Sequence, residues 1–328
     1  MRAFLLALGF SLFLAIVVAY PWPVSAQAPV QKSAEKSDTH SNAEGIVRTA
    51  MKNVDFHLTD TIVVHIAALE GKLASDNGGI PVFDDKSSFH LEVDSASIQV
   101  QPQAMTNALN DYVFAKPGAP LKDLVLTIQG NEVVMKGVLA NKGDIHFETQ
   151  GTMAATPDGQ IRVHTLKVRA LHLPVKGLMD LLGLDTAKLL DTSKISGVAV
   201  DKDDLLLDPQ LLLPPPKMHG HLSSIQIQNG LIAMTFGAPG RKETIASRCG
   251  GRNFQSFRGG TVRFGKLTMI DTDLELMDAD PADPFDFSID HYMDQLVAGY
   301  SKMTKQGGLC AHVPDYNKLP HGPQHQTK

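Results

Sequence analysis

Cysteine is scarce in this sequence, since Cys249 and Cys310 are the only two among 328 residues and neither has a Cys-x-x-Cys partner. A cysteine-ligated metal site or a dithiol redox centre is therefore not expected. The sequence also lacks the Gly-x-Ser-x-Gly, His-Glu-x-x-His, P-loop and dinucleotide-binding spacings, so no known motif selects a reaction. These absences predict a protein that is not an enzyme and that carries no cofactor or metal.

A strong charge of one sign is missing as well. The chain has 30 Lys and Arg against 35 Asp and Glu, a net charge of −5. No basic run is interleaved with aromatic residues, so nucleic acid is not an expected partner. Hydrophobic residues make up 43% of the chain, which is enough for a sizeable core in one large domain or two smaller ones.

The N-terminus has the layout of a secretory signal peptide. Arg2 precedes an apolar run over residues 3–20, and two prolines and several small residues follow. This order predicts a signal peptide over residues 1–26, cleaved before Gln27, and hence an exported, periplasmic or envelope-associated protein. An uncleaved N-terminal membrane anchor is the alternative, because about 18 apolar residues just span a bilayer.

Composition divides the rest of the chain into four segments. Residues 27–45 are small and polar, which indicates a flexible linker. We expect the main domain over residues 46–236 and a C-terminal hairpin and helix packed on it over residues 237–318. Residues 319–328 have the composition of a disordered tail.

Alternation of apolar and polar residues dominates the main domain and predicts strands. One long half-buried strand is expected from six apolar residues of one parity: Val54, Phe56, Leu58, Ile62, Val64 and Ile66. In the next strand the parity changes near Ser95, as at a β-bulge. Residues 122–171 hold turn residues at three places and predict an antiparallel meander of four strands. Further strands are expected over these ranges: 198–207, 221–228, 231–236 and 260–277.

Three stretches have helical periodicity: 105–113, 174–190 and 288–300, the last capped by Asp286 or Ser288. The expected fold class is therefore α+β. The runs Leu205–Leu207 and Leu211–Leu213 predict strand buried on both faces, ended by the triple proline at an edge or crossing.

Two groups of residues are candidate metal ligands. His219 and His221 would share one face of a strand, but no third ligand stands at a recognisable spacing. The acidic segment 277–287 lacks the glycine and the final glutamate of an EF-hand loop. We therefore predict no metal site, with a rigid turn as the interpretation of the acidic segment.

The glycine-rich segment 237–260 predicts a loop with clustered cations. Arg241, Lys242 and Arg252 would suit contact with a phosphate or lipid headgroup, and a solvated hairpin loop is the alternative. Cys249 lies in the same loop. In an oxidising compartment Cys249 and Cys310 could close a loop of 61 residues (310 − 249), worth about 4 kcal/mol, although the spacing alone does not establish that they meet.

Residues 89–228 resemble the tubular lipid-binding (TULIP) superfamily and, within it, the LmeA-like phospholipid-binding proteins of bacterial envelopes. Five segments carry the resemblance: AMTNALNDYVF, PLKDLVLTIQGNEVVMKGVL, FETQGTMAATPDGQIRVHTLKVRAL, LPVKGLMDLLGL and LLLDPQLLLPPPKMHGHLSSIQI. The resemblance implies a long, highly curved antiparallel sheet wrapped around an amphipathic helix, with a lipid groove and no catalytic residue. The chain from Gly237 onwards has no counterpart in that pattern, which leaves the access to the groove open.

The function expected is therefore binding of phospholipid or another long apolar ligand in a hydrophobic groove. An acyl chain of about sixteen carbons would gain roughly 12 kcal/mol from burial, before ordering costs. The expected lining is apolar: Leu124, Leu126, Ile128, Val133, Met135, Leu139, Leu178, Leu181 and Leu182. One alternative is a structural module whose core packs on itself and whose helix 288–300 docks an envelope protein. A remote alternative is a metal-assisted hydrolase that uses His219 and His221.

Overall fold

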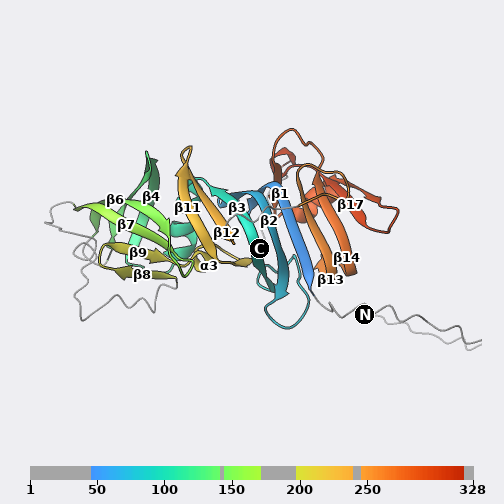
Figure 1. Cartoon of the computed structure of the whole chain (residues 1–328), viewed down its shortest axis with the longest axis horizontal. Coiled ribbons are helices and arrows are strands. Elements are labelled where there is room, and N and C mark those ends of the chain that lie inside the picture. Colours follow the sequence, from blue (N-terminus) through green and yellow to red (C-terminus); the bar gives the residue numbers. More distant parts are fainter. Residues whose placement is uncertain (1–45, 141–143, 171–196, 239–244, 321–328) are drawn as a thin grey trace, which may run out of the picture. The chain divides into compact units, whose positions relative to one another are not determined.

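The computed structural model describes residues 46–140, 144–170, 197–238 and 245–320, in which strands far outnumber short helices (Figure 1). The expected β-rich α+β class is therefore confirmed. The described residues belong to one compact unit. The predicted signal peptide, the linker and the helix 174–190 lie outside the described residues.

Eleven strands of the described residues form the larger sheet, in the order β11-β12-β3-β2-β1-β13-β14-β17-β16, with β10 beside β3 and β15 beside β1. Their bounds are β1 (Val47–His57), β2 (Val63–Ser75), β3 (Phe89–Val100), β10 (Lys217–His219), β11 (Leu222–Gln228), β12 (Leu231–Gly237), β13 (Phe254–Phe264), β14 (Leu267–Asp278), β15 (Phe285–Ser288), β16 (Tyr300–Met303) and β17 (Leu309–Val313). Strands from 254 onwards thus lie in the same sheet as the first three strands.

The N-terminal strand β1 lies inside this sheet and pairs with three partners. Along one side it is antiparallel to β2. Along the other side, residues 48–52 pair antiparallel with β13 and residues 54–57 pair parallel with β15. Asn53 stands at the change of partner with a φ of 52°, and its side-chain amide donates to Asn253 Oδ1 at 2.8 Å.

The expected single strand over 54–66 is wrong, because the chain turns at residues 58–62 and returns. Val54 then faces Ile66 and Phe56 faces Val64 on β1 and β2. All six residues of the pattern are nevertheless buried, since the turn preserves their parity. Residues 260–277 likewise form a hairpin rather than one strand. The bulge expected near Ser95 is confirmed by a register shift between the pairs Glu70↔Ser95 and Gly71↔Val93.

Six strands of the described residues form the second sheet, in the order β4-β5-β6-β7-β9-β8. Their bounds are β4 (Leu121–Gln129), β5 (Glu132–Leu139), β6 (Ile145–Ala155), β7 (Ile161–Ala170), β8 (Val198–Asp201) and β9 (Asp204–Leu207). The four-strand meander expected over 122–171 is confirmed by β4 to β7. The segment 198–207 is a hairpin of β8 and β9 rather than one strand.

The helices are short. The first is α1 (Pro102–Ala108), which continues into the π-helix η1 (Leu109–Val113) as its apolar stripe predicts. The second leucine run ends the short helix α3 (Pro209–Leu212), whose N-terminus is capped by Asp208, and so it is not a strand. The last helix, α4 (Tyr292–Ala298), is shorter than 288–300, and neither Asp286 nor Ser288 caps it because both lie in β15. None of the helices in the described ranges is long and apolar enough to cross a membrane.

Both sheets contribute to one hydrophobic core. It includes Val54 and Phe287 of the larger sheet, Leu126 and Phe147 of the smaller sheet, and Met105 of α1. Strands β11 and β6 also contact each other without pairing. The inner faces of the two sheets therefore meet around α1.

Candidate functional site

Three apolar cavities lie within the shared core. Cavity 1 has a volume of about 30 Å³ and lies against β1 to β3. Its lining is Met51, Phe56, Leu58, Val64, Ile66, Leu73, Phe83, Phe89, Leu91, Pro216, Met218, Gln255 and Ile289. Cavity 2, also about 30 Å³, is lined by Ile62, Val64, Ile98, Val100, Ala104, Met105, Ile161, Pro209, Leu212, Leu213, Met218, Met234 and Phe236. It lies between the two sheets, because these residues come from both.

Cavity 3 lies on the inner face of the second sheet and has a volume of about 40 Å³. Its lining is Met105, Leu109, Phe114, Leu121, Leu126, Val133, Met135, Thr149, Gly151, Met153, Ile161, Val163, Thr165, Leu205 and Leu207. Cavities 1 and 2 share Val64 and Met218, whereas cavities 2 and 3 share Met105 and Ile161. The three cavities therefore follow one another with common walls from the larger sheet to the smaller one.

The residues expected to line a groove divide into three groups. Leu126, Val133 and Met135 line cavity 3. Leu124 and Leu139 are buried in the core, and Ile128 packs against it. The other three, Leu178, Leu181 and Leu182, lie outside the described residues.

One polar residue of cavity 1 has an unpaired atom. Gln255 on β13 is 1% exposed, and its Oε1 has no hydrogen-bond partner among the described residues. Thr49 Oγ1 on β1 is in the same situation. Since Met51 faces Gln255 and Thr49 faces Phe257, Thr49 and Gln255 are diagonal neighbours on one face of the sheet. The sequence alone did not indicate this pair, because Thr49 and Gln255 are far apart along the chain and only the pairing of β1 with β13 brings them together.

Of the residues expected to contact a headgroup, Arg241 and Lys242 lie outside the described residues and Arg252 is exposed. The structure joins Cys249 to Cys310 in a disulfide with a Cα–Cα distance of 5.9 Å. The disulfide packs with Phe254 and Met277 in a small cluster of its own.

Next to the disulfide lies a buried charge network. Glu275 is fully buried and accepts hydrogen bonds from Ser247 Oγ and the Arg248 backbone N–H. The guanidinium of Arg258 lies 3.0 Å from Glu275 and also contacts Asp273. Burial lowers the pKa of Arg258 from its ordinary value, with Arg248 adding to the effect. The network ties the segment after 245 to β13 and β14.

The two histidines of the metal hypothesis do not share a strand, because β10 ends at His219 and β11 begins at Leu222. His219 stacks on His90 with ring centroids 4.3 Å apart. Asp280 of the acidic segment lies 2.9 Å from the ammonium of Lys318, which also lies 2.8 Å from Asp315. No group of three metal-ligating side chains occurs in the part of the chain that the structure describes.

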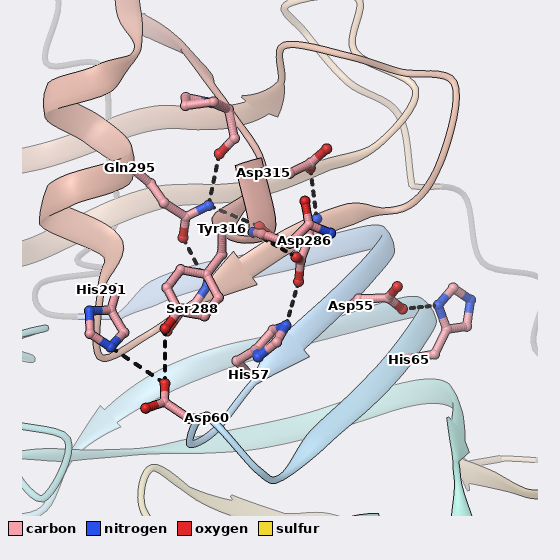
Figure 2. Close-up of polar contacts among 12 residues, drawn as sticks. Asp55, His57, Asp60, His65, Asp286, Ser288, His291, Gln295, Asp315 and Tyr316 are labelled. Atoms are coloured by element: carbon pink, nitrogen blue, oxygen red, sulfur yellow. Dashed lines mark hydrogen bonds and ion pairs between the residues drawn. The ribbon is translucent and has the colours of Figure 1, made fainter. Parts of the chain in front are cut away.

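A buried histidine–carboxylate cluster that the sequence did not predict lies where β1 pairs with β15 (Figure 2). His57 Nε2 contacts Asp286 Oδ1, and the Asn317 backbone N–H donates to Asp286 Oδ2 at 3.1 Å. The Tyr316 ring packs edge-on against His57, and its hydroxyl donates to Asp60 at 3.0 Å. Burial, followed by Asp60, raises the pKa of Tyr316 to about 12.

This cluster is not arranged as a nucleophile with its base. Ser288 is fully buried, and its Oγ has no hydrogen-bond partner among the described residues. A serine nucleophile needs a base within hydrogen-bond reach and access to substrate. Gln295 of α4, also fully buried, instead donates to the carbonyls of Asp286 and Pro314 at 2.9 Å. The cluster therefore fastens the segment 314–317 and α4 to the larger sheet.

An open depression of about 590 Å³ lies beside α4 and is rich in carboxylates. Asp84, Asp85 and Asp294 line it together with the ion pair of Lys86 and Asp290 at 2.6 Å. It is polar, whereas the three internal cavities are apolar.

Comparison of the chain with protein-family models, with curated proteins and with solved structures finds no match.

Proposed function

We propose that the protein is an exported, non-enzymatic envelope protein that binds phospholipid or another long apolar ligand between the inner faces of its two sheets. The observation that carries the proposal is the series of three apolar cavities with shared walls. Methionine, leucine and isoleucine dominate this lining, and an acyl chain gains free energy from burial without any polar motif. The ligand enters as the walls of these cavities move apart.

The resemblance to the tubular lipid-binding proteins supports the same proposal. The segments that carry it include α1, η1 and the meander β4 to β7, which together surround cavity 3. In this proposal the second sheet curves around the helical segment and holds the apolar end of the ligand. The cationic loop with Arg241, Lys242 and Arg252 contacts the headgroup.

A second candidate function is a structural or interaction module whose core packs on itself. Two observations favour it. The three cavities have volumes of about 30 to 40 Å³, whereas ligand pockets measure roughly 300–1,000 Å³. On α4, Val297 is 80% exposed, which suits docking of an envelope protein partner.

Native mass spectrometry of the mature chain from Gln27, purified from the envelope without detergent, separates the two candidates. Lipid binding predicts a discrete added mass that organic extraction identifies as lipid. A bare protein mass that incubation with phospholipid vesicles leaves unchanged would overturn the lipid-binding proposal in favour of the structural module.

A further inference from the structure

We propose that cavities 1, 2 and 3 are segments of one path for a single unbranched hydrocarbon chain, whose uncharged polar end binds Gln255 and whose tail passes Met218 and Met105 into the second sheet. This inference rests on the proposed function. It adds the orientation of the ligand and its chemical class, a linear chain with a hydroxyl, protonated carboxyl or amide end.

The polar end is assigned from the unpaired atoms at the larger sheet. Burial of an amide oxygen without a partner costs free energy, and such groups are rare in folded proteins. Gln255 is the one polar residue in the lining of cavity 1, and its Oε1 is unpaired among the described residues. A ligand hydroxyl at this position donates to Gln255 Oε1.

The end group is uncharged because cavity 1 offers it no counter-ion. None of its lining residues carries a charge, and burial of an ion without a partner is far more costly than burial of a hydroxyl. A phosphate or a quaternary ammonium therefore does not lie at Gln255. If the ligand has a charged headgroup, only its acyl part lies on this path.

The walls between the cavities contain the most adaptable side chains. Six of the chain's 12 methionines line the three cavities, namely Met51, Met105, Met135, Met153, Met218 and Met234. Each shared wall pairs one methionine with one β-branched residue, Met218 with Val64 and Met105 with Ile161. The β-branched side chains are stiff, whereas methionine has three rotatable bonds and fills irregular gaps. In this proposal, rotation of Met218 and Met105 opens the two shared walls as the inner faces of the sheets move apart.

The same walls select a linear chain. A rigid ring system is wide and would require a large separation of the cavity walls. A chain of methylene groups is narrow and needs a smaller opening at Met218 and Met105. Each methylene group that enters raises the affinity about fourfold. The affinity should therefore increase along a series of alcohols until the path is filled.

The test is equilibrium binding of octanol, dodecanol and hexadecanol to the mature chain from Gln27. For the wild type we expect the affinity to rise from octanol to hexadecanol. Met105→Trp fills the wall between cavities 2 and 3, so it should lower hexadecanol affinity more than about tenfold and leave octanol affinity within about twofold. Met303→Trp on β16, where Met303 is 74% exposed, is the matched control and should change neither. Where Met105→Trp does not melt cooperatively, Met105→Phe replaces it.

Gln255→Met keeps the length of the side chain and removes its amide. Because the hydrogen bond is common to all three alcohols, this change should lower each affinity by about the same factor, roughly tenfold. An unchanged affinity in Gln255→Met would overturn the orientation. A wild type that binds the long alcohol best, with the same preference in Met105→Trp, would overturn the path but leave lipid binding in place. A wild type that binds none of the three would overturn the path and the proposed function together.

Discussion

His57 on β1 and Asp286 on β15 form a buried hydrogen-bonded pair across two parallel strands, and the two residues are 229 positions apart in sequence. Their side chains are 15% and 10% exposed. Asp55, two residues before His57, pairs with His65 at 2.6 Å, and this second pair is 37% and 28% exposed (Figure 2). Strand β1 thus offers a buried and an exposed version of the same interaction.

Asp286→Ala should lower the free energy of unfolding by about 2 kcal/mol, because it leaves the buried His57 ring without its hydrogen-bond partner. Asp55→Ala should cost less than about 1 kcal/mol, because the pair that it breaks is solvated and screened. Urea denaturation of both variants measures the difference. Equal losses of unfolding free energy in the two variants would show that burial of the His57 pair adds nothing to stability.

Removal of the disulfide by the double change Cys249→Ala and Cys310→Ala should lower the free energy of unfolding by about 4 kcal/mol, from the entropy of the loop between them. Reduction of the wild type should reproduce the loss. The same reductant should leave the double variant unchanged, which provides the control. A wild type whose melting temperature is insensitive to reductant contradicts a stabilising role for this bond.

Leu126→Glu should abolish lipid retention, because Leu126 lines cavity 3 and is 9% exposed. Val125→Glu is the matched control, since the neighbouring side chain is 46% exposed and the same charge there stays in water. Native mass spectrometry checks both. If the core instead packs on itself, Leu126→Glu should lower stability outright through an unpaired buried charge. A folded Leu126→Glu variant that still carries lipid would contradict the assignment of cavity 3.

Protonation of His312 should lower the stability of the folded protein as the pH falls below neutral. Burial, followed by the charge of Lys302, lowers the pKa of His312 in the folded protein. Between that lowered pKa and the unfolded value of about 6.5, the unfolded chain binds a proton that the folded chain does not. Stability therefore decreases as the pH falls through this window.

His312→Phe keeps the ring that stacks on Tyr300, whose centroid lies 4.5 Å away, and removes the proton. Melting temperatures measured from pH 7 to pH 5 should fall less steeply in this variant than in the wild type. If the melting temperatures of the two proteins fall in parallel with pH, His312 does not contribute to the pH dependence of stability.

The periodicity of the sequence predicted most strands but not where they turn. Residues 54–66 read as one strand because Leu58 and Ile62 keep the parity of Val54 and Ile66 on either side of the turn. Periodicity records which face a residue occupies and not the direction of the chain. The helix expected over 288–300 is shorter than predicted, because Ser288 belongs to β15, which pairs with β1, and Gly299 ends α4 in extended backbone.

For the candidate sites, the sequence predicted the kind of residue involved but not which residues come together. Leucine and methionine indicated an apolar interior, but the walls that join the cavities combine residues such as Val64 and Met218 from distant strands. The same limit applies to His57 and Asp286. Single histidines and aspartates on strands are common. Only the parallel pairing of β1 with β15 brings His57 and Asp286 into contact.

The position of β1 also constrains how the chain is made and folded. One side of β1 can pair with β2 as soon as residue 75 is available. Its other side needs β13 for residues 48–52 and β15 for residues 54–57, so part of it stays unpaired until residue 288 has been synthesised. An unpaired strand edge is prone to aggregation, and pairings over such separations form slowly. The larger sheet is therefore completed only after residue 288 has been made, which favours chaperones that bind the first strand while later strands are still emerging.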